Sequence, residues 1–476
     1  MDFFAEPASL FGIVVLIVLF VLGSTYLLKR FRSVESHVVY SLWRSEKFAS
    51  AIRQLSFMGP VVNFFAIIGA ILGFGVLAAD FIFAKEKKLW LRLALATIIS
   101  LNMAIFYFFT FRSLVLGTTF TRPYDTIFLL FFSVFGMSFF GFILMLVNGI
   151  HILQGIFAGS TVCPGVAPLI PGVRIPKVPV FIPWYGWLAL LIAMLLHEGA
   201  HGIQAIKSKL KLKSAGVLLV GLLPFGAFVE PDEEQLKKAD FKKRITIYAA
   251  GPSANLFSVP IFLIIALLFN SYFVMPVYEK YQKSYLENVE GVEVSNVLET
   301  IPYCNSPKSP AFGILKPGVR IVAVDGNQIK NRLELYGILS SERFKERTFT
   351  IIDENKELVV SLLPNQELPL NPPENFGFTV KDVLKENANI DLEAREALIN
   401  LSLIENFLWL CFLLSFLVML FNFLPIVPLD GGYIAGDLYS YYFFGEINER
   451  NRKIVSDVLL AFFFIIALLN ILPFFI

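Results

Sequence analysis

Long runs of apolar residues without charge constrain this chain more than any other feature. A bilayer core of roughly 30 Å is crossed by about 20 helical residues, and the 476-residue sequence contains several runs of that length. With 56% hydrophobic and only 16% charged residues, the chain has too little polar surface for a soluble protein. We therefore predict a polytopic α-helical membrane protein in a lipid bilayer.

About eight spans are predicted from these runs. Their approximate limits are residues 9–28, 61–84, 90–109, 126–150, 184–206, 245–270, 399–424 and 454–476. The first run follows an acidic start, MDFFAE, rather than the basic segment of a cleaved signal peptide, so we interpret it as a retained span. The polar stretch between the sixth and seventh spans predicts a small inserted α+β domain.

Basic residues orient the predicted spans. Lys and Arg are densest at residues 207–213 and 237–244, and such clusters mark the cytoplasmic side of a membrane. We therefore expect the N-terminus and the inserted domain to lie outside. The net charge of +2 gives no indication of a nucleic-acid partner.

The segment LLHEGAHG, residues 195–202, ends the fifth predicted span. His197 and His201 are four residues apart, so on a helix both imidazoles project from one face and suit two ligands of a tetrahedral zinc ion. Glu198 follows His197 directly and could polarise a water at the metal as a general base. HExxH can match by chance on a surface helix, but ionisable groups inside a span are rare and usually functional.

A catalytic zinc needs a third protein ligand. The segment NFLPIVPLDGG, residues 422–432, ends the seventh predicted span at the same depth and carries Asp430. Breaks by Pro and Gly at membrane depth are tolerated where they line a cavity, although Asp430 before two glycines could also form a simple turn. His37 and His151 are the other histidines, and we expect them to be solvated or interfacial.

These two motifs together resemble the signatures of the site-2 protease family of intramembrane zinc metalloproteases. HExxH lies on one span, and N-x-x-P-x-x-x-L-D-G, from Asn422 to Gly431, ends a later one. A G-P-x-x-N pattern between them is matched by Gly251, Pro252 and Asn255, and GAFVEP, residues 226–231, resembles the family's re-entrant β segment. The resemblance covers about residues 164–436 and leaves the first four spans outside.

The resemblance implies one catalytic zinc ion held by His197, His201 and Asp430, with Glu198 as the general base. Asn255 and Asn422 would bind the substrate backbone or the oxyanion, although Asn255 could instead be a helix-packing amide. Substrates would be transmembrane proteins in a prokaryotic cell membrane, cleaved within or near their spans on its cytoplasmic half. The apolar, glycine-rich residues 215–231 could offer an edge strand that captures them.

Residues 290–364 resemble a bacterial-type PDZ domain. Val294, Val297, Ile321, Val322 and Val324 read as sheet residues, and Asp325-Gly326 reads as a turn. PDZ domains bind extended peptides by strand addition, and a carboxylate loop is expected near residues 290–292. Because a GLGF-like loop is absent, a peptide receptor and a steric gate against large ectodomains both stay open. Residues 380–401 predict an acidic helix that leads into the seventh span.

This interpretation divides the chain into four regions. They are an N-terminal four-span region of unknown role (1–150), the first part of a protease core (151–270), the extracytoplasmic insert (271–400), and the second part of the core with the final span (401–476). The three cysteines, at positions 163, 304 and 411, form no CxxC pair and are predicted to be isolated thiols.

Two other classes of function compete with a protease. A membrane metal transporter would also place His and Asp in spans, but it needs several sites along a path, and the sequence has one cluster. A proteolytically silent scaffold with a PDZ-like domain would have no use for Glu198 between the ligands.

Overall fold

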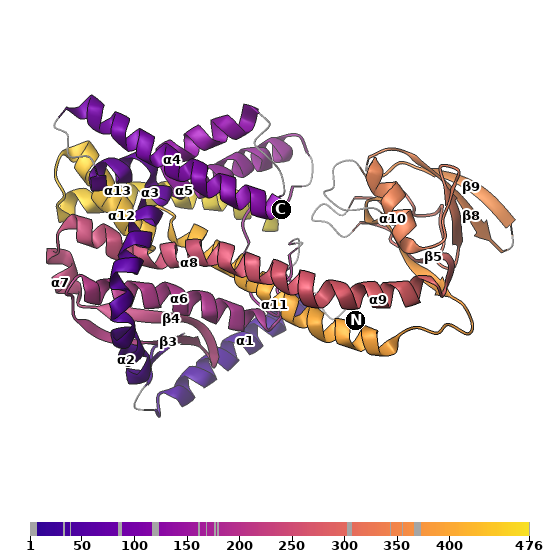
Figure 1. Cartoon of the computed structure of the whole chain (residues 1–476), viewed down its shortest axis with the longest axis horizontal. Helices are drawn as coiled ribbons and strands as arrows, with labels where there is room; N and C mark the ends of the chain where they lie inside the picture. Colours follow the sequence, from indigo (N-terminus) through magenta and orange to yellow (C-terminus); the bar gives the residue numbers. More distant parts are fainter. Residues whose placement is uncertain are drawn as a thin grey trace.

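The computed structural model describes residues 7–31, 34–38, 40–83, 88–116, 123–159, 162–167, 169–175, 178, 180–301, 307–342, 344–354, 356–365 and 373–475. For residues 7–17, 106–116, 123–128 and 225 it describes the backbone alone. Figure 1 shows a bundle of long helices on the left and a smaller domain of strands on the right, joined by long helices.

Eight helices of 22 residues or more dominate the described part of the chain. They are α1 (Pro7–Leu28), α3 (Gly59–Phe83), α4 (Leu89–Leu116), α5 (Pro123–Phe157), α6 (Gly186–Lys207), α8 (Phe241–Phe269), α11 (Leu392–Asn422) and α13 (Glu449–Ile471). Shorter helices are α2 (Glu46–Gln54), α7 (Glu233–Lys238), α9 (Met275–Leu286), α10 (Arg332–Ser341) and α12 (Asp430–Phe444).

Six helical stretches of the described residues are long and apolar enough to cross a membrane. They are Glu46–Phe83, Leu129–Phe157, Gly186–Lys207, Phe241–Leu286, Leu392–Asn422 and Glu449–Phe474. This confirms a polytopic helical membrane protein. Two further apolar helical stretches, Val18–Leu28 and Leu89–Ile105, are shorter over their described residues, so the count of eight spans stays a prediction.

Helix α3 covers the span predicted over residues 61–84, but it is interrupted. At its start, a Cβ added to Gly59 would lie 2.8 Å from Lys207 Cγ, at the end of α6. Near its other end, the Phe81 ring lies 4.0 Å from the ring of Phe241, the first residue of α8. Both neighbours belong to the same end of the α6–α8 pair. The helix is kinked at Gly75, whose φ of 60° and ψ of −139° interrupt it in a region that glycine alone tolerates well.

A second interrupted helix meets α3 at its kink. Helix α5 breaks at Gly136, where φ is 70°. A Cβ on Gly75 would lie 2.3 Å from the Val134 carbonyl oxygen, and a Cβ on Gly136 would lie 2.3 Å from that of Gly73. Beside this contact, Phe74 packs edge-on against Phe423, which follows α11. One buried core therefore joins the N-terminal helices to the C-terminal half.

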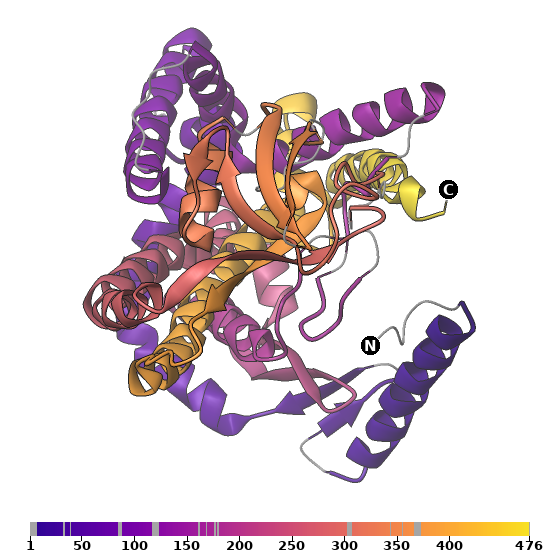
Figure 2. The same ribbon diagram turned by 90° about the vertical axis from the view of Figure 1, so that its right-hand side faces the viewer.

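A four-stranded antiparallel sheet lies beside α6. Its order is β1 (Val34–Ser36), β2 (Tyr40–Arg44), β3 (Leu212–Val220) and β4 (Leu223–Pro231). The predicted β segment GAFVEP belongs to β4, but β1 and β2 were not predicted. Figure 2 shows α1 set apart from the other helices, with this sheet between them. Because β2 covers the far side of β3, β4 is the long edge strand, and it faces α6.

The inserted domain contains a second, antiparallel sheet of six strands. Its order is β10 (Phe378–Leu384), β5 (Val289–Val297), β6 (Arg320–Val324), β8 (Arg347–Asp353) and β9 (Lys356–Leu362), with β7 (Asn327–Gln328) paired to β6. The predicted sheet residues lie in β5 and β6. Asp325 and Gly326 have positive φ angles of 49° and 79°, which confirms the predicted turn.

Two predictions for the insert are wrong. The expected carboxylate loop at residues 290–292 lies inside β5, where Val292 is fully buried and pairs with both Ile321 and Asp382. The predicted helix over residues 380–401 begins only at Leu392, because its first residues belong to β10. Phe378 and Val380 alternate toward the core, which is a strand pattern.

A helical stalk joins the insert to the bundle. Helix α8 continues through a π-helical turn, Asn270–Val274, into α9, and α11 runs beside both. Asn270 Nδ2 donates to Glu405 Oε1 at 2.7 Å, which links the two helices at the π turn. The sheet domain is therefore carried on two helices that continue into the helical bundle (Figure 1).

The cysteines differ from the prediction of isolated thiols. Cys163, in the connection between α5 and α6, is disulfide-bonded. Cys411 on α11 is a free, buried thiol, whereas Cys304 lies outside the described residues.

Candidate metal centre

Helix α6 carries two histidines on one buried face. His197 is 2% exposed, and the His197 and His201 ring centroids are 4.8 Å apart. His201 Nδ1 lies 2.7 Å from the Ile247 carbonyl oxygen on α8. A carbonyl only accepts, so this nitrogen holds the proton and leaves the Nε2 lone pair free for a metal.

Asp430 completes a triangle of donor atoms with these histidines. Its Oδ2 lies 3.0 Å from His197 Nε2 and 3.1 Å from His201 Nε2, and the two Nε2 atoms are 3.2 Å apart. The three side chains form a metal-ligand group in the described part of the chain. The structure therefore brings together the residues predicted to bind the metal, although they come from helices more than 200 residues apart in sequence.

Two glycines allow Asp430 to reach this position at the start of α12. The chain leaves α11 at Asn422 and folds back before α12 begins. A Cβ on Gly431 would lie 2.3 Å from the Phe423 carbonyl oxygen, and one on Gly432 would lie 2.2 Å from the Ile426 carbonyl carbon. Only glycine permits this close backbone approach, so the fold requires glycine at both positions after Asp430.

The donor set fits a zinc ion. Zinc takes imidazole nitrogens and carboxylate oxygens at about 2.0–2.2 Å in tetrahedral geometry, which puts neighbouring ligand atoms about 3.3–3.5 Å apart. The three observed separations are slightly shorter and nearly equal. On α8, a Cβ on Gly251 would lie 2.2 Å from His201 Nε2 and 2.6 Å from His197 Nε2. The absence of a side chain there leaves the converging lone pairs unobstructed.

Glu198 makes its hydrogen bond to the neighbouring sheet. Its Oε2 accepts the Val229 backbone N–H at 2.9 Å. Val229 lies on the edge strand β4, so the carboxylate predicted as general base is held by the sheet rather than by the ligands. Its second oxygen makes no hydrogen bond in the described part of the chain that would prevent it from accepting a proton.

The two asparagines have different surroundings. Asn255 lies one helical turn after Gly251, is fully buried, and neither amide atom has a hydrogen-bond partner within the described residues. Such a group is costly unless another molecule satisfies it. Asn422 donates to the Val418 carbonyl oxygen on its own helix at 3.0 Å, so its Nδ2 is already used.

The remaining histidines lie elsewhere. His37 stacks on Tyr40, with ring centroids 4.5 Å apart, and lies 3.7 Å from Glu35. His151 is exposed on α5. Neither belongs to the ligand group found among the described residues.

A family model described as "Peptidase family M50" matches residues 185–466, more than half of the chain and all six predicted site residues. The chain belongs to peptidase family M50. An uncharacterized protein of Methanocaldococcus jannaschii is 31% identical over 279 residues, which are 58% of this chain and 62% of that protein. A membrane-bound transcription factor site-2 protease homolog of Arabidopsis thaliana is 27% identical over 164 residues, 34% of this chain and 28% of its own. The chain thus spans less than two thirds of the length of either relative.

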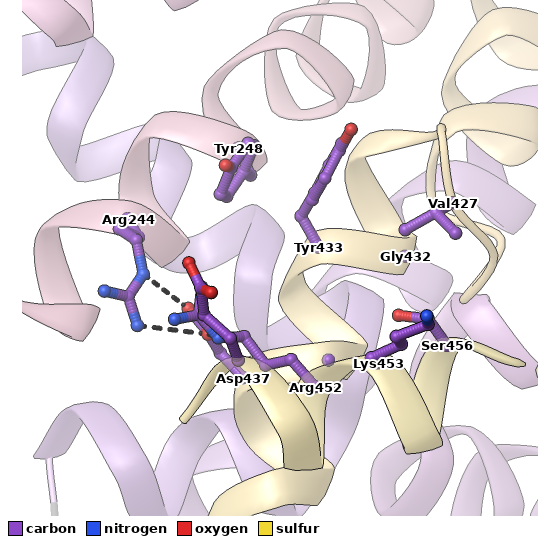
Figure 3. A pocket seen from close by; sticks show the side chains of 11 residues that line it. Arg244, Tyr248, Val427, Gly432, Tyr433, Asp437, Arg452, Lys453 and Ser456 are labelled. Carbon is purple, nitrogen blue, oxygen red and sulfur yellow. Dashed lines mark hydrogen bonds and ion pairs between the residues drawn. The ribbon is translucent and has the colours of Figure 1, made fainter. Parts of the chain in front are cut away.

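The M50 segment also contains a polar cavity of about 180 Å³ beside the first turns of α12. Tyr248 and Tyr433 line it and stack with ring centroids 4.8 Å apart. Deeper in, Arg244 donates from Nε and Nη2 to the Asp437 carboxylate at 2.9 and 3.1 Å (Figure 3). This buried ion pair ties α12, which presents Asp430, to α8, which presents Gly251.

Sequence reasoning missed three parts of the M50 site. Gly251 was noted as part of a motif but not as the wall of the metal site. The Ile247 carbonyl and the Val229 N–H are backbone groups, and the residue type gives no indication of their role. The Arg244–Asp437 pair joins two buried ionisable residues, and a buried charge pair of this kind was the one detectable clue.

Proposed function

We propose that this protein is an intramembrane zinc metalloprotease that hydrolyses peptide bonds within or near the transmembrane segments of membrane-anchored proteins. The observation that carries the proposal is the convergence of His197, His201 and Asp430 from two helices inside an apolar bundle. Membership of peptidase family M50 supports the reaction class.

The division of labour follows from the contacts. His197, His201 and Asp430 would hold the zinc ion, which when bound acidifies a water to a pKa of about 7 and polarises the substrate carbonyl. Glu198 would take the proton from the attacking water as the new C–O bond forms. It would then deliver that proton to the leaving amide nitrogen as the C–N bond breaks.

Substrate contacts come from neighbouring elements. The unsatisfied amide of Asn255 would bind the substrate backbone or the oxyanion, and Asn422 would do so after releasing its bond to Val418. The substrate must unwind before water can attack, and β4 would take it up as an added strand. Val229 N–H is already bound to Glu198, so the added strand would pair nearer to Leu223.

The orientation rests on charge and chemistry. The basic residues at 207–213 and 237–244 flank the ends of α6 and α8 near the metal centre, which supports an active site on the cytoplasmic half of a prokaryotic cell membrane. The disulfide at Cys163 favours an oxidising compartment for the opposite side, where the insert would lie. The four regions predicted from the sequence remain part of this proposal.

The strand order of the PDZ-like domain bears on its two proposed roles. β10 occupies the sheet edge beside β5, where a peptide was expected to add. A receptor would therefore have to use the outer edge of β10 or β9, whereas a steric gate needs no free edge. We keep both roles, with the gate favoured by this pairing.

The same site also argues against the two alternative functions, a metal transporter and a silent scaffold. A metal transporter needs successive sites, and the described residues contain one cluster. A silent scaffold leaves Glu198 without a task. Measuring bound zinc and cleavage of a transmembrane peptide for wild type and Glu198→Gln separates the three. A protease keeps zinc in both proteins but loses about 10²–10⁴-fold in rate in the variant. Equal activities in the two proteins would remove the assigned base.

A further inference from the structure

Arg44, the last residue of β2, connects all four strands of the sheet beside α6. Its Nη1 donates to Ser214 Oγ on β3 at 2.5 Å and to Glu230 Oε2 on β4 at 3.0 Å. Its Nη2 donates to Glu35 Oε2 on β1 at 2.6 Å. One guanidinium from the N-terminal region thus reaches the edge strand of the sheet.

The contact on β4 lies one residue from the contact to Glu198. Glu230 follows Val229, whose N–H donates to Glu198 Oε2. Neighbouring residues of a strand direct their backbone groups to opposite sides. The Val229 N–H therefore faces α6, while Phe228 pairs with Gly216 on β3.

Side-chain contacts add to the backbone pairing of β4 with β3 at this end of the strand. Strand β4 has β3 on one side only. At this end, Glu230 accepts hydrogen bonds from Ser214 Oγ at 2.7 Å and from Arg44. One carboxylate on β4 therefore bonds to both β3 and β2. The Glu230 carboxylate makes both bonds charge-assisted, and in the Arg44 bond the donor is charged as well.

We propose that Arg44 is a positioning residue for Glu198, acting through Glu230 and the Val229 N–H. The inference rests on the proposed function, in which Glu198 is the general base. It also gives the N-terminal region a task in catalysis, because Arg44 and Glu35 lie before the segment that matches the family model.

The test compares Arg44→Ala, Arg44→Lys and the charge-reversed pair Arg44→Glu with Glu230→Arg, the last made together with Glu35→Gln so that two carboxylates do not face each other. Arg53→Ala is the matched control, because Arg53 forms only an exposed 3.8 Å ion pair with Glu46 on α2. Amide hydrogen exchange of the segment containing Val229 is measured in zinc-loaded and metal-free protein. Zinc content, kcat and KM on a transmembrane peptide are measured in parallel.

In Arg44→Ala we expect exchange at Val229 to rise about fivefold, the value of one ordinary hydrogen bond. We expect kcat to fall about tenfold, with KM within about twofold and zinc content unchanged, because proton transfer depends steeply on the position of the base. Arg44→Lys should be intermediate, and the charge-reversed pair should regain most of the loss.

Four outcomes overturn or separate the claims. Exchange in Arg44→Ala equal to that in Arg53→Ala overturns the positioning contact. Faster exchange with unchanged kcat overturns its role in catalysis. If no variant and no wild-type protein cleaves the peptide, the proposed function fails, while the exchange contrast still decides whether Arg44 holds the Val229–Glu198 contact. Failure of the charge-reversed pair to recover would mean that Arg44 acts by some route other than Glu230.

Discussion

Asp430 and Glu198 are both carboxylates at the metal centre, but their partners assign them different chemistry. Asp430 Oδ2 touches both histidine Nε2 atoms. Glu198 touches a backbone N–H on another element. A metal ligand bonds to the ion and is buried with it. A general base lies beside the ion and keeps an oxygen free to accept a proton. Their substitution should therefore have separable effects.

Asp430→Ala should lose zinc and activity together. Altering a group behind a metal ligand already costs 10–100-fold in metal affinity, so removing a ligand should cost at least that much. Helix α12 should stay in place because Asp437 keeps its bonds to Arg244. Zinc titration and thermal unfolding check both points, with His37→Ala and His151→Ala as controls that keep wild-type affinity. Wild-type zinc binding by Asp430→Ala would require another third ligand.

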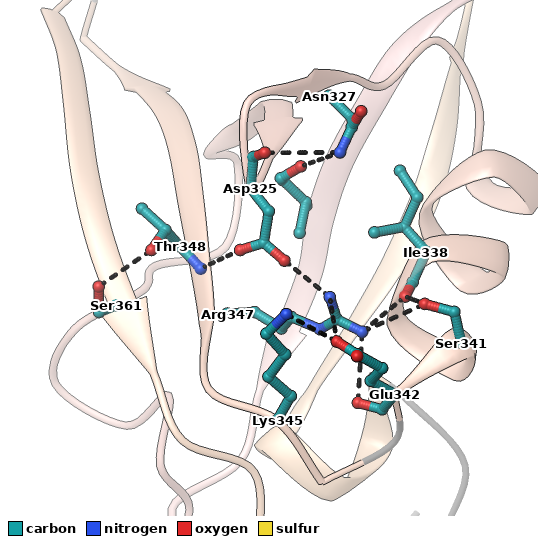
Figure 4. A network of polar contacts seen from close by, with 10 residues as sticks. Asp325, Asn327, Ile338, Ser341, Glu342, Lys345, Arg347, Thr348 and Ser361 are labelled. Carbon is teal, nitrogen blue, oxygen red and sulfur yellow. Dashed lines mark hydrogen bonds and ion pairs between the residues drawn. The ribbon is translucent and has the colours of Figure 1, made fainter.

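Asp325 is the centre of a polar network in the sheet domain (Figure 4). Partial burial acts to raise the pKa of Asp325, but the Thr348 N–H and the Arg347 guanidinium outweigh it and lower that pKa below its usual value. The Arg347 guanidinium, 2.7 Å from Asp325 Oδ2, is itself almost fully buried and also donates to the Ile338 carbonyl oxygen. A carboxyl with a lowered folded pKa stabilises the fold above its unfolded pKa of about 4 and loses this effect as pH falls through the folded value.

We therefore predict that Asp325→Asn destabilises the sheet domain by about 1–3 kcal/mol at pH 7, since a bond to a buried charge is lost. The difference from wild type should shrink below about pH 4, where the wild-type carboxyl also becomes protonated. Amide exchange of β8, corrected for intrinsic rates, measures both values. Glu290→Gln is the control, because the Glu290–Arg320 pair of the same domain is exposed and worth little. An Asp325 effect that stays constant between pH 7 and pH 3 would contradict this account.

At the scale of elements, long apolar runs and short motifs were enough to find the helices that carry the site. Helices α6, α8, α11 and α13 lie within a few residues of the predicted limits, because each run exceeds the length that a membrane requires. His197 and His201 share one face since helical spacing alone determines it. Asp430 was found from its position after a broken span.

Other elements could not be found in this way. Strand β2 pairs with β3, more than 160 residues later, and no local pattern reveals such a partner. The kinks at Gly75 and Gly136 lie inside uninterrupted apolar runs that contain other glycines. These kinks depend on each other's backbone, so each is visible only once both helices are placed. No helix was predicted where α12 lies, because it is short and begins beside proline and glycine.

Helix α8 leaves room for the metal site because Gly251 has no side chain, and this gives a testable prediction. Gly251→Ala would put a methyl group 2.2 Å from His201 Nε2, so a histidine must move and zinc affinity should fall by at least 10–100-fold. The helix itself should tolerate alanine, which is the better helix former. Zinc titration and thermal unfolding separate these effects. The control is Gly199→Ala on α6, where a Cβ meets nothing within 4 Å; equal zinc affinities in the two variants would contradict the prediction.

At the scale of the whole molecule, the metal site and the sheet domain lie at opposite ends of shared helices (Figure 1). The pairing of β10 with β5 means that the domain extends beyond residue 364. Asp391, which begins α11, bonds to Ser284 and Lys280 on α9 at 3.1 and 2.9 Å. The two stalk helices thus hold each other below the domain, and residues 289–384 can be excised between them.

Replacing residues 289–384 by a short Gly/Ser linker should leave zinc affinity unchanged, because every ligand comes from α6 or α12. If the domain is a gate, cleavage of substrates with large ectodomains should rise several-fold relative to short ones. If it is a receptor, cleavage of its preferred substrates should fall. Competition between a short and a long substrate measures the ratio, and an unchanged ratio with unchanged rates would exclude both roles.

The coverage of β3 by β2 has a consequence for the direction of travel of a client chain. Strand β4 starts at the Gly221 turn and ends at Pro231, and the next residue, Asp232, bonds to the carbonyl of Lys211 just after the basic end of α6. Strand β4 has one long open edge, to which a client strand can add. Antiparallel pairing is slightly more stable than parallel pairing, so the client would run opposite to β4 and enter from the basic side. We therefore expect the enzyme to discriminate the polarity of a span: a segment with its amino end at the basic side should be cut, and the same residues threaded the opposite way should survive. Two reporters that carry one span in both orientations measure this, and equal cleavage would mean that the sheet does not set the direction.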